Sequence, residues 1–119
     1  MHFSRYFVFF ERTEEEFYRS IGLSFKNLRD KELWLPRVEA FCQYKKPARF
    51  EDVLEIELTV EELREKSAKL AFTVTKEGTT ELLATGYFVV VAADKNIGRA
   101  TQIPKEFADK LKPFAKQIL

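Results

Sequence analysis

The residues of this chain that could do chemistry begin at its N-terminus, where a helix is predicted to start. Ser4 suits a helix N-cap, because its hydroxyl can accept a hydrogen bond from a free amide of the first turn. The N-terminal end of a helix has unpaired N–H groups and a partial positive charge, so it can hold an anion. His2 stands just before this helix, and an imidazole changes its charge near neutral pH. His2 is either a group that positions substrate or water, or a frayed terminal side chain.

A carboxylate inside the predicted helix is a second candidate. Apolar residues recur at three- and four-residue spacing over residues 4–21, which indicates a helix with one buried face, and Gly22 is placed to end it. Glu14 occupies a position where this spacing calls for an apolar side chain. A partly buried glutamate has a raised pKa and can act as a general base. The alternative is an ion pair with a basic side chain on the same face or across a dimer. The apolar positions are Phe3, Phe7, Phe10, Phe17 and Ile21.

Length and composition restrict the class of protein. The 119 residues suit one domain, spanning 1–119, and 45% hydrophobic with 33% charged residues is typical of a globular protein. A net charge of +1 gives no reason to expect nucleic acid or an anionic membrane as a partner. No apolar run approaches the roughly 20 residues of a membrane-spanning helix. The aromatic N-terminus is interrupted by Arg5 and Glu11, so we do not expect a signal peptide.

The single cysteine indicates the compartment. Cys42 cannot form an internal disulfide, which fits a reducing environment and a cytoplasmic protein. It sits in an apolar alternation, which is typical of a core side chain rather than a nucleophile. No cluster of cysteine and histidine suggests a metal site, and no cofactor is expected.

Four strands and a short helix are predicted after the long helix. The strands cover residues 33–45, 52–62, 67–76 and 81–93, and the final helix opens at Pro104. The fourth strand is apolar on both faces, so it belongs in the middle of a sheet or against another chain, and we expect dimerisation. The expected core faces are Val38, Ala40, Cys42 and Tyr44; Leu54, Ile56, Leu58 and Val60; Ala68, Leu70, Phe72 and Val74; and, on the last helix, Phe107, Leu111, Phe114 and Ile118.

This order of elements predicts an α+β fold in which the sheet wraps around the apolar face of the long helix. Arg37, Glu39, Gln43 and Lys45 are expected mostly on the face of the first strand that points away from the core. Pro113 is expected to kink or shorten the last helix.

Four stretches of the chain carry a resemblance to a known family. They are residues 9–24, which contain Phe9-Phe10-Glu11-Arg12; residues 43–54, which contain Tyr44, Pro47-Ala48 and Glu51-Asp52; Arg64-Glu65-Lys66-Ser67; and Ile103-Pro104-Lys105-Glu106. In this order and spacing the chain resembles the hotdog-fold acyl-CoA thioesterases of the hydroxybenzoyl-CoA thioesterase type. The resemblance implies a sheet curled around a central helix, a homodimer or dimer of dimers, and active sites at the dimer interface.

The resemblance implies roles for the first residues of the chain. The thioester carbonyl would be held by backbone amides at the start of the central helix, here Ser4, Arg5 and Tyr6. Phe3 takes the family's position just before the helix, with His2 beside it. Tyr6 matches a family aromatic residue, which either packs in the core or lines the substrate pocket.

The resemblance also implies a binding region for the CoA nucleotide. Arg64, Lys66 and Ser67 match a hairpin whose basic residues meet the phosphates of CoA in the family, and charge-assisted bonds suit arginine and lysine there. The alternative is that these are exposed hairpin charges.

The chain departs from the family at its start. The family's first strand, its catalytic aspartate and the following glycine would lie before Met1. Either translation begins upstream of this methionine, or the protein lacks the usual carboxylate. The expected function is hydrolysis of an acyl-CoA thioester. The alternative is a non-catalytic hotdog module that binds acyl-CoA or only assembles.

Overall fold

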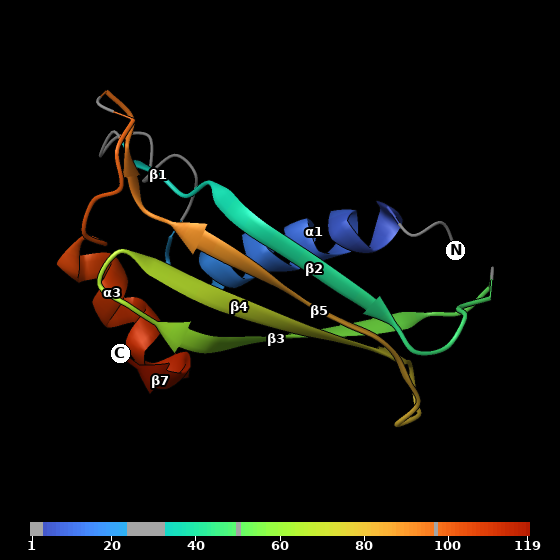
Figure 1. The fold of residues 1–119 in the computed structure, drawn as a ribbon. Coiled ribbons are helices and arrows are strands. Elements are labelled where there is room, and N and C mark those ends of the chain that lie inside the picture. Colours follow the sequence, from blue (N-terminus) through green and yellow to red (C-terminus); the bar gives the residue numbers. More distant parts are fainter. Residues whose placement is uncertain (1–3, 24–32, 50, 97) are drawn as a thin grey trace.

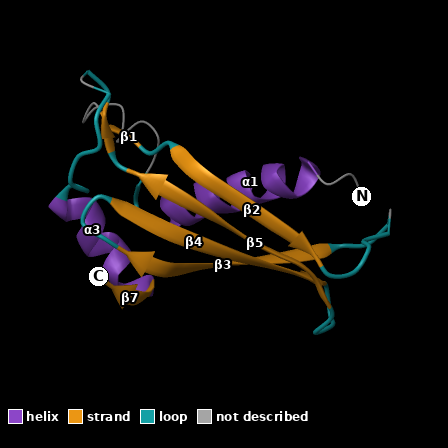
Figure 2. Ribbon diagram, in the orientation of Figure 1, coloured by secondary structure: helices purple, strands orange, loops and turns teal. Residues whose placement is uncertain are grey.

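One long helix lies against a five-stranded sheet in the computed structural model, which describes residues 4–23, 33–49, 51–96 and 98–119 (Figure 1). The helix is α1 (Ser4–Ser20), and the sheet order is β2-β5-β4-β3-β7. A second, two-stranded sheet pairs β1 with β6. Figure 2 shows that α3 and β7 lie together at the end of the sheet far from the N-terminus. The remaining bounds are β1 (Leu33–Trp34), β2 (Arg37–Tyr44), β3 (Leu54–Leu63), β4 (Ser67–Lys76), β5 (Leu82–Val91), β6 (Ala93–Asp94), α3 (Lys105–Leu111), the 3-10 turn η1 (Lys112–Phe114) and β7 (Ala115–Ile118).

The long helix is confirmed to within one residue of its predicted end. Its buried side chains are Tyr6, Phe10, Glu14 and Tyr18, which are four residues apart and therefore form one stripe along the helix. Gly22 follows with a φ of 83°, a conformation that glycine adopts without steric cost. Of the predicted apolar face, Phe3 lies outside the described residues, while Phe7, Phe17 and Ile21 pack against the edge of the core.

The interior position of the predicted fourth strand is confirmed. Within the range 81–93, β5 lies between β2 and β4, and Leu83, Phe88 and Val90 are buried. Because both faces of this strand are apolar, the sequence also predicts that the leftover apolar surface lies chiefly on it, and that prediction is wrong. No residue of β5 is among the large exposed apolar side chains of the described residues, whereas three residues of β2 are: Val38 is 62% exposed, and Phe41 and Tyr44 are each 44% exposed. The reason is that β2 is the edge strand and has only β5 beside it among the described strands.

The predicted strand over residues 33–45 is in fact two strands. Pro36 lies between β1 and β2, where its missing N–H cannot contribute to a ladder. A register shift between Arg37 and Glu39 then changes the faces of β2. Arg37 consequently turns toward the helix and Val38 away from the core, which reverses the sequence prediction for both residues.

The two following strands have the predicted core faces. Range 67–76 agrees with β4 at both ends, and its residues Ala68, Leu70, Phe72 and Val74 are all buried. In β3, which was predicted over 52–62, Val60 is buried, while Leu54, Ile56 and Leu58 are only partly covered.

The C-terminal segment differs from the prediction of one helix. Phe107 and Leu111 are buried on α3 as expected, but α3 ends at Leu111 and a 3-10 turn follows. Pro113 lacks an N–H group and its ring clashes with the preceding turn, so the helix cannot continue. The chain then extends as β7, parallel to β3, and Phe114 and Ile118 are about half exposed instead of forming a helical stripe.

No helix among the described residues has both the length and the apolar character needed to cross a membrane. Between α1 and β1, Leu23 is buried, and residues 24–32 lie outside the described part of the structure.

Candidate active site

The N-terminal end of α1 is the first feature of the candidate site. The backbone amides of Ser4, Arg5 and Tyr6 belong to the first turn, where a helix provides no carbonyl acceptors. The first turn contains no acidic side chain, so its partial positive charge is not neutralised locally. His2, Phe3 and the Ser4 side chain lie outside the described part of the structure, and their predicted roles remain predictions.

Tyr6 lies under this helix end with a buried hydroxyl. Its side chain is 1% exposed, and its ring centroid is 5.2 Å from that of Tyr44 on β2. Among the described residues, the hydroxyl has no hydrogen-bond partner. Burial raises the pKa of Tyr6, and the nearby Cys42 and Asp52 raise it further. Tyr6 is therefore a neutral donor at physiological pH, and it belongs to the core whether or not it also contacts a ligand.

Cys42 lies beside these two tyrosines. Burial raises the pKa of the Cys42 thiol, so the thiol stays protonated near neutral pH and is a poor nucleophile. This agrees with its reading as a core side chain.

A cleft of about 260 Å³ opens between α1 and β3 at the same end of the helix. It is lined by Phe9, Asp52, Leu54 and Ile56, three apolar side chains and one carboxylate. The Asp52 side chain is 11% exposed, accepts the Arg49 N–H at 2.7 Å and lies 3.4 Å from the Lys76 ammonium. The Arg49 amide, followed by Lys76, holds the pKa of Asp52 below its usual range. An ionised carboxylate therefore borders this apolar cleft.

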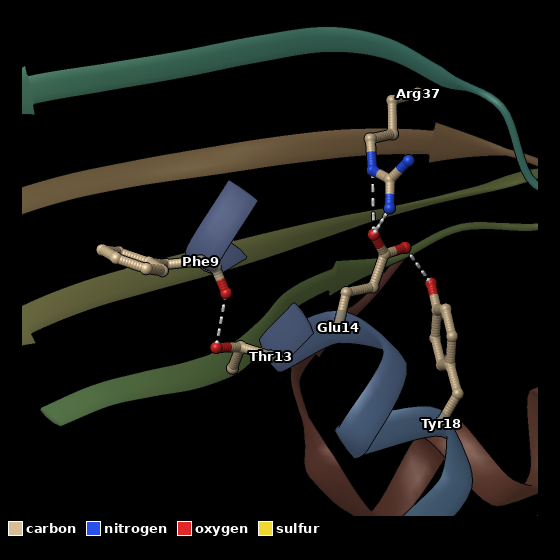
Figure 3. A network of polar contacts seen from close by, with 5 residues as sticks. All are labelled: Phe9, Thr13, Glu14, Tyr18 and Arg37. Carbon is tan, nitrogen blue, oxygen red and sulfur yellow. Dashed lines mark hydrogen bonds and ion pairs between the residues drawn. The ribbon is translucent and has the colours of Figure 1, made fainter. Parts of the chain in front are cut away.

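Glu14 is held in a buried polar network (Figure 3). One carboxylate oxygen accepts two bonds from the Arg37 guanidinium, with Nε at 2.9 Å, and the other accepts the Tyr18 hydroxyl at 2.7 Å. The Glu14 side chain is 2% exposed and the Arg37 side chain 31%. Burial raises the pKa of Glu14, while the Tyr18 bond and the Arg37 charge act in the opposite direction.

Two roles were predicted for Glu14, a general base and a partner in an ion pair. The structure contains an ion pair, which Glu14 forms with Arg37 of the same chain. Ten residues of helix separate Glu14 from Ser4, a rise of about 15 Å. Within one chain, the structure therefore does not bring Glu14 to the amides of the first turn. Arg37 was missed as the partner because no local sequence pattern connects it with Glu14.

The basic hairpin lies at the other end of the molecule. Residues 64–66 join β3 to β4, which begins at Ser67, and the Glu65 carbonyl accepts the Ile103 N–H at 2.8 Å just before α3. The C-terminal end of α1 is also there, with Gly22 O 3.4 Å from Lys110 Nζ. Figure 1 shows the start of α1 at the opposite end of the sheet. The structure thus does not bring Arg64, Lys66 and Ser67 together with Tyr6.

A groove of about 320 Å³ adjoins this hairpin. Arg64 lines it together with Lys105 and Lys112, two basic residues for which no role at a site was predicted. Arg64 is 55% exposed and lies 3.6 Å from Glu62. The groove also contains the carboxylate of Glu65, and Lys112 lies 3.4 Å from Asp109. Basic side chains thus outnumber acidic ones in the lining, beside the apolar side chains of Leu63 and Ile118.

Comparison with known proteins identifies the family. Residues 1–111 match the profile of the thioesterase-like superfamily. The chain belongs to this superfamily. It is 37% identical over 112 residues to a protein of Aquifex aeolicus (strain VF5) named "Putative esterase", a match that covers 94% of this chain and 84% of that protein.

Solved structures agree with this assignment. The gentisyl-coenzyme A thioesterase BH1999 superposes with a TM-score of 0.80 at 26% identity, over 94% of this chain and 86% of that one. The Staphylococcus aureus protein SAV2348, solved in complex with CoA, superposes with a TM-score of 0.89 at 24% identity, over 96% of this chain and 72% of that one. The α+β hotdog fold predicted from the sequence is confirmed.

The buried ion pair predicts the effect of removing Arg37. Arg37→Ala leaves the Glu14 carboxylate buried without its cation, and we expect a loss of about 2–3 kcal/mol in the free energy of unfolding at pH 7. The loss should shrink at pH 5, where Glu14 can take a proton. Urea denaturation measures both values. Arg19→Ala, which removes an exposed pair with Glu16, is the control and should cost less than about 0.5 kcal/mol. Equal losses in the two variants would contradict the prediction.

The raised pKa of Glu14 predicts a pH dependence. A group whose pKa is higher in the folded state contributes stability at low pH, and this contribution is lost as the pH rises through its folded pKa. The free energy of unfolding of the unaltered protein minus that of Glu14→Gln should therefore fall between about pH 4 and neutrality and then level off. Denaturation of both proteins across this range tests the sign. A difference that grows with pH would mean that attraction to Arg37 exceeds the desolvation of Glu14.

Proposed function

We propose that this protein is an acyl-CoA thioesterase of the hydroxybenzoyl-CoA type, acting in the cytoplasm. Membership of the thioesterase-like superfamily supports this reaction class, as does similarity to a gentisyl-coenzyme A thioesterase. The observation that carries the proposal is the start of α1, whose first turn has no acidic side chain and lies at the same end of the molecule as an apolar cleft. The single cysteine is the basis for the proposed location.

The proposed mechanism uses the amides as hydrogen-bond donors. The thioester carbonyl oxygen accepts N–H groups from the first turn, which stabilise the negative charge that develops when water attacks the carbonyl carbon. The carbon–sulfur bond then breaks, the CoA thiolate takes up a proton, and a free acid leaves. A carboxylate is needed to take the proton of the attacking water. Both candidate carboxylates have partners, Asp52 with the Arg49 amide and Lys76, and Glu14 with Arg37 and Tyr18. Of the two, Asp52 is the one at this end of the molecule, and it is ionised.

In the same proposal the hairpin at Arg64, Lys66 and Ser67 binds the phosphates of CoA. Lys105 and Lys112 add charge to the groove beside Arg64, which suits a polyanionic ligand. The CoA complex of SAV2348 supports CoA as the ligand class for this fold.

A second candidate function is a non-catalytic module that binds acyl-CoA or only assembles. The observation that favours it is the engagement of both Glu14 carboxylate oxygens, which removes one predicted base from use. Thiol release from a panel of acyl-CoAs, followed with a thiol reagent, separates the two functions. CoA binding by calorimetry without thiol release from any acyl-CoA would favour the module.

We also propose a homodimer, or a dimer of dimers, formed through β2. This edge strand exposes Val38, Phe41 and Tyr44, and its outer backbone edge has no partner among the described strands.

Deleting one amide tests the role of the helix start. Proline is tolerated in the first turn, so Arg5→Pro removes one N–H while the helix is kept. We expect kcat for thioester hydrolysis to fall by about 10²–10³ relative to Arg5→Ala, which removes the same side chain but keeps the amide. Thiol release measures both variants. Activity of Arg5→Pro within about twofold of Arg5→Ala would exclude this amide as a donor to the oxyanion.

A charge on the edge strand tests the dimer. Val38→Lys should convert the dimer to a monomer at micromolar concentration, because a lysine in a paired edge must be desolvated. Sedimentation velocity measures the change. Thr73→Lys, at an exposed position of the interior strand β4, should leave the dimer intact. If the unaltered protein sediments as a monomer at micromolar concentration, the proposed dimer is contradicted.

A further inference from the structure

The start of β2 contains one residue more than the strand beside it. Arg37 aligns with Val90 of β5 and Glu39 with Val89, so Val38 is the extra residue of a β-bulge. The Arg37 side chain points toward α1, whereas Val38 is 62% exposed. The bulge therefore decides which of these two neighbouring side chains lies under the helix.

The alternation of residues along β2 favours the opposite arrangement. Cys42 packs against the core, and the ring of Tyr44 lies 5.2 Å from an aromatic ring of α1, so both are on the helix side of the sheet. Side chains alternate between the two faces of a regular strand, which would place Val38 on the helix side and Arg37 on the other. Val38 would then take the place of Arg37 opposite Val90, which is buried, and two apolar side chains on neighbouring strands stabilise each other.

The contacts of Arg37 under the helix hold the bulged register. Its guanidinium donates to one carboxylate oxygen of Glu14, with Nε at 2.9 Å, and its central carbon lies 4.9 Å from the centre of the Phe88 ring. The Glu14 side chain is 2% exposed. In the regular register Arg37 would leave this carboxylate, and a charge buried without its partner is strongly unfavourable. Glu14 thus opposes the apolar alternation of β2.

We propose that Glu14 selects the register of β2 and, through it, the surface that a second copy of the chain binds. With the ion pair formed, Val38 belongs to the exposed edge of the sheet. Without the pair, Val38 moves under α1, and β2 loses its most exposed large apolar side chain. A buried polar contact that adds little net stability specifies one arrangement over another in this way, as a core asparagine does in coiled coils. The effect on assembly rests on the homodimer proposed above, and the register does not depend on it.

Removal of the carboxylate tests the register. Glu14→Leu completes the apolar spacing of α1 and leaves Arg37 able to move into solvent. In the NMR spectrum, cross-strand backbone NOEs that join Arg37 to Val90 in the unaltered protein should join Val38 to Val90 in this variant. If leucine prevents folding, Glu14→Met removes the same charge with a more flexible side chain. A folded variant of either kind that keeps the NOEs between Arg37 and Val90 would overturn the proposal.

Tyr18→Phe is the matched control. It removes the hydrogen bond that the Tyr18 hydroxyl donates to the other oxygen of Glu14 at 2.7 Å, and it keeps the ion pair with Arg37. We expect this variant to keep the NOEs between Arg37 and Val90. A changed register in Tyr18→Phe would mean that loosening α1 is sufficient, and it would overturn the role of the ion pair.

Sedimentation velocity measures the effect on assembly. The dissociation constant of the dimer should rise at least about tenfold in Glu14→Leu and stay within about twofold in Tyr18→Phe. An unchanged dissociation constant in a variant whose register has changed would overturn the link with assembly. A monomeric unaltered protein would contradict the homodimer alone, and the NOEs would still decide the register.

Discussion

The close approach of α1 to the sheet is the constraint on which the rest of the structure depends. The Phe10 ring stacks on Phe72 of β4 at 4.4 Å between centroids, with 6° between the ring planes, and meets Phe88 of β5 edge-on. Gly86 of β5 makes room for this ring, since a Cβ there would lie 2.5 Å from both Phe10 Cε2 and the Phe41 carbonyl oxygen. The helix can lie low on the sheet only because this position has no side chain. The burial of the stripe of side chains along α1, including Tyr6 and Glu14, follows from this close contact.

The same stripe explains why a charged group is buried under the helix. Glu14 lies one turn beyond Phe10 on a face that the sheet covers, so its carboxylate is desolvated. Arg37 can reach it because the register shift in β2 turns this arginine inward. The ion pair joins the middle of α1 to the start of the edge strand, while the aromatic contacts join α1 to β4 and β5. A buried pair of this kind contributes little net stability, but removing either partner alone destabilises the fold because the other charge stays buried.

The periodic pattern of apolar residues predicts most of the fold. The features that could not be predicted are those that depend on contacts between residues far apart in the sequence. The helix over 4–21, the core face of β4 and the interior position of β5 could be predicted, because the pattern of apolar residues reflects burial directly. The bulge at Arg37 could not be predicted, because it leaves no mark in the order of apolar and polar residues and changes only which side chains face inward. The strand β7 was missed for a related reason. Pro113 signals the end of a helix, but pairing with β3 depends on a neighbour about 55 residues away.

The candidate site was harder to predict than the fold. The amides at the start of α1 followed from the helix itself, and the hairpin charges followed from the family resemblance. The partner of Glu14 and the basic residues Lys105 and Lys112 became visible only in three dimensions, because each is brought in by a different element.

The separation of the two ends has a consequence for stoichiometry. The start of α1 and the groove at Arg64 lie at opposite ends of a molecule 43 Å long. The helix α1 runs from the first feature to near the second, and its 17 residues rise about 25 Å. A ligand much shorter than this cannot touch both features of one chain, so a site built from both would take one feature from each of two chains. The number of complete sites would then follow the number of assembled pairs, and activity per chain would fall steeply on dilution below the dissociation constant of the pair.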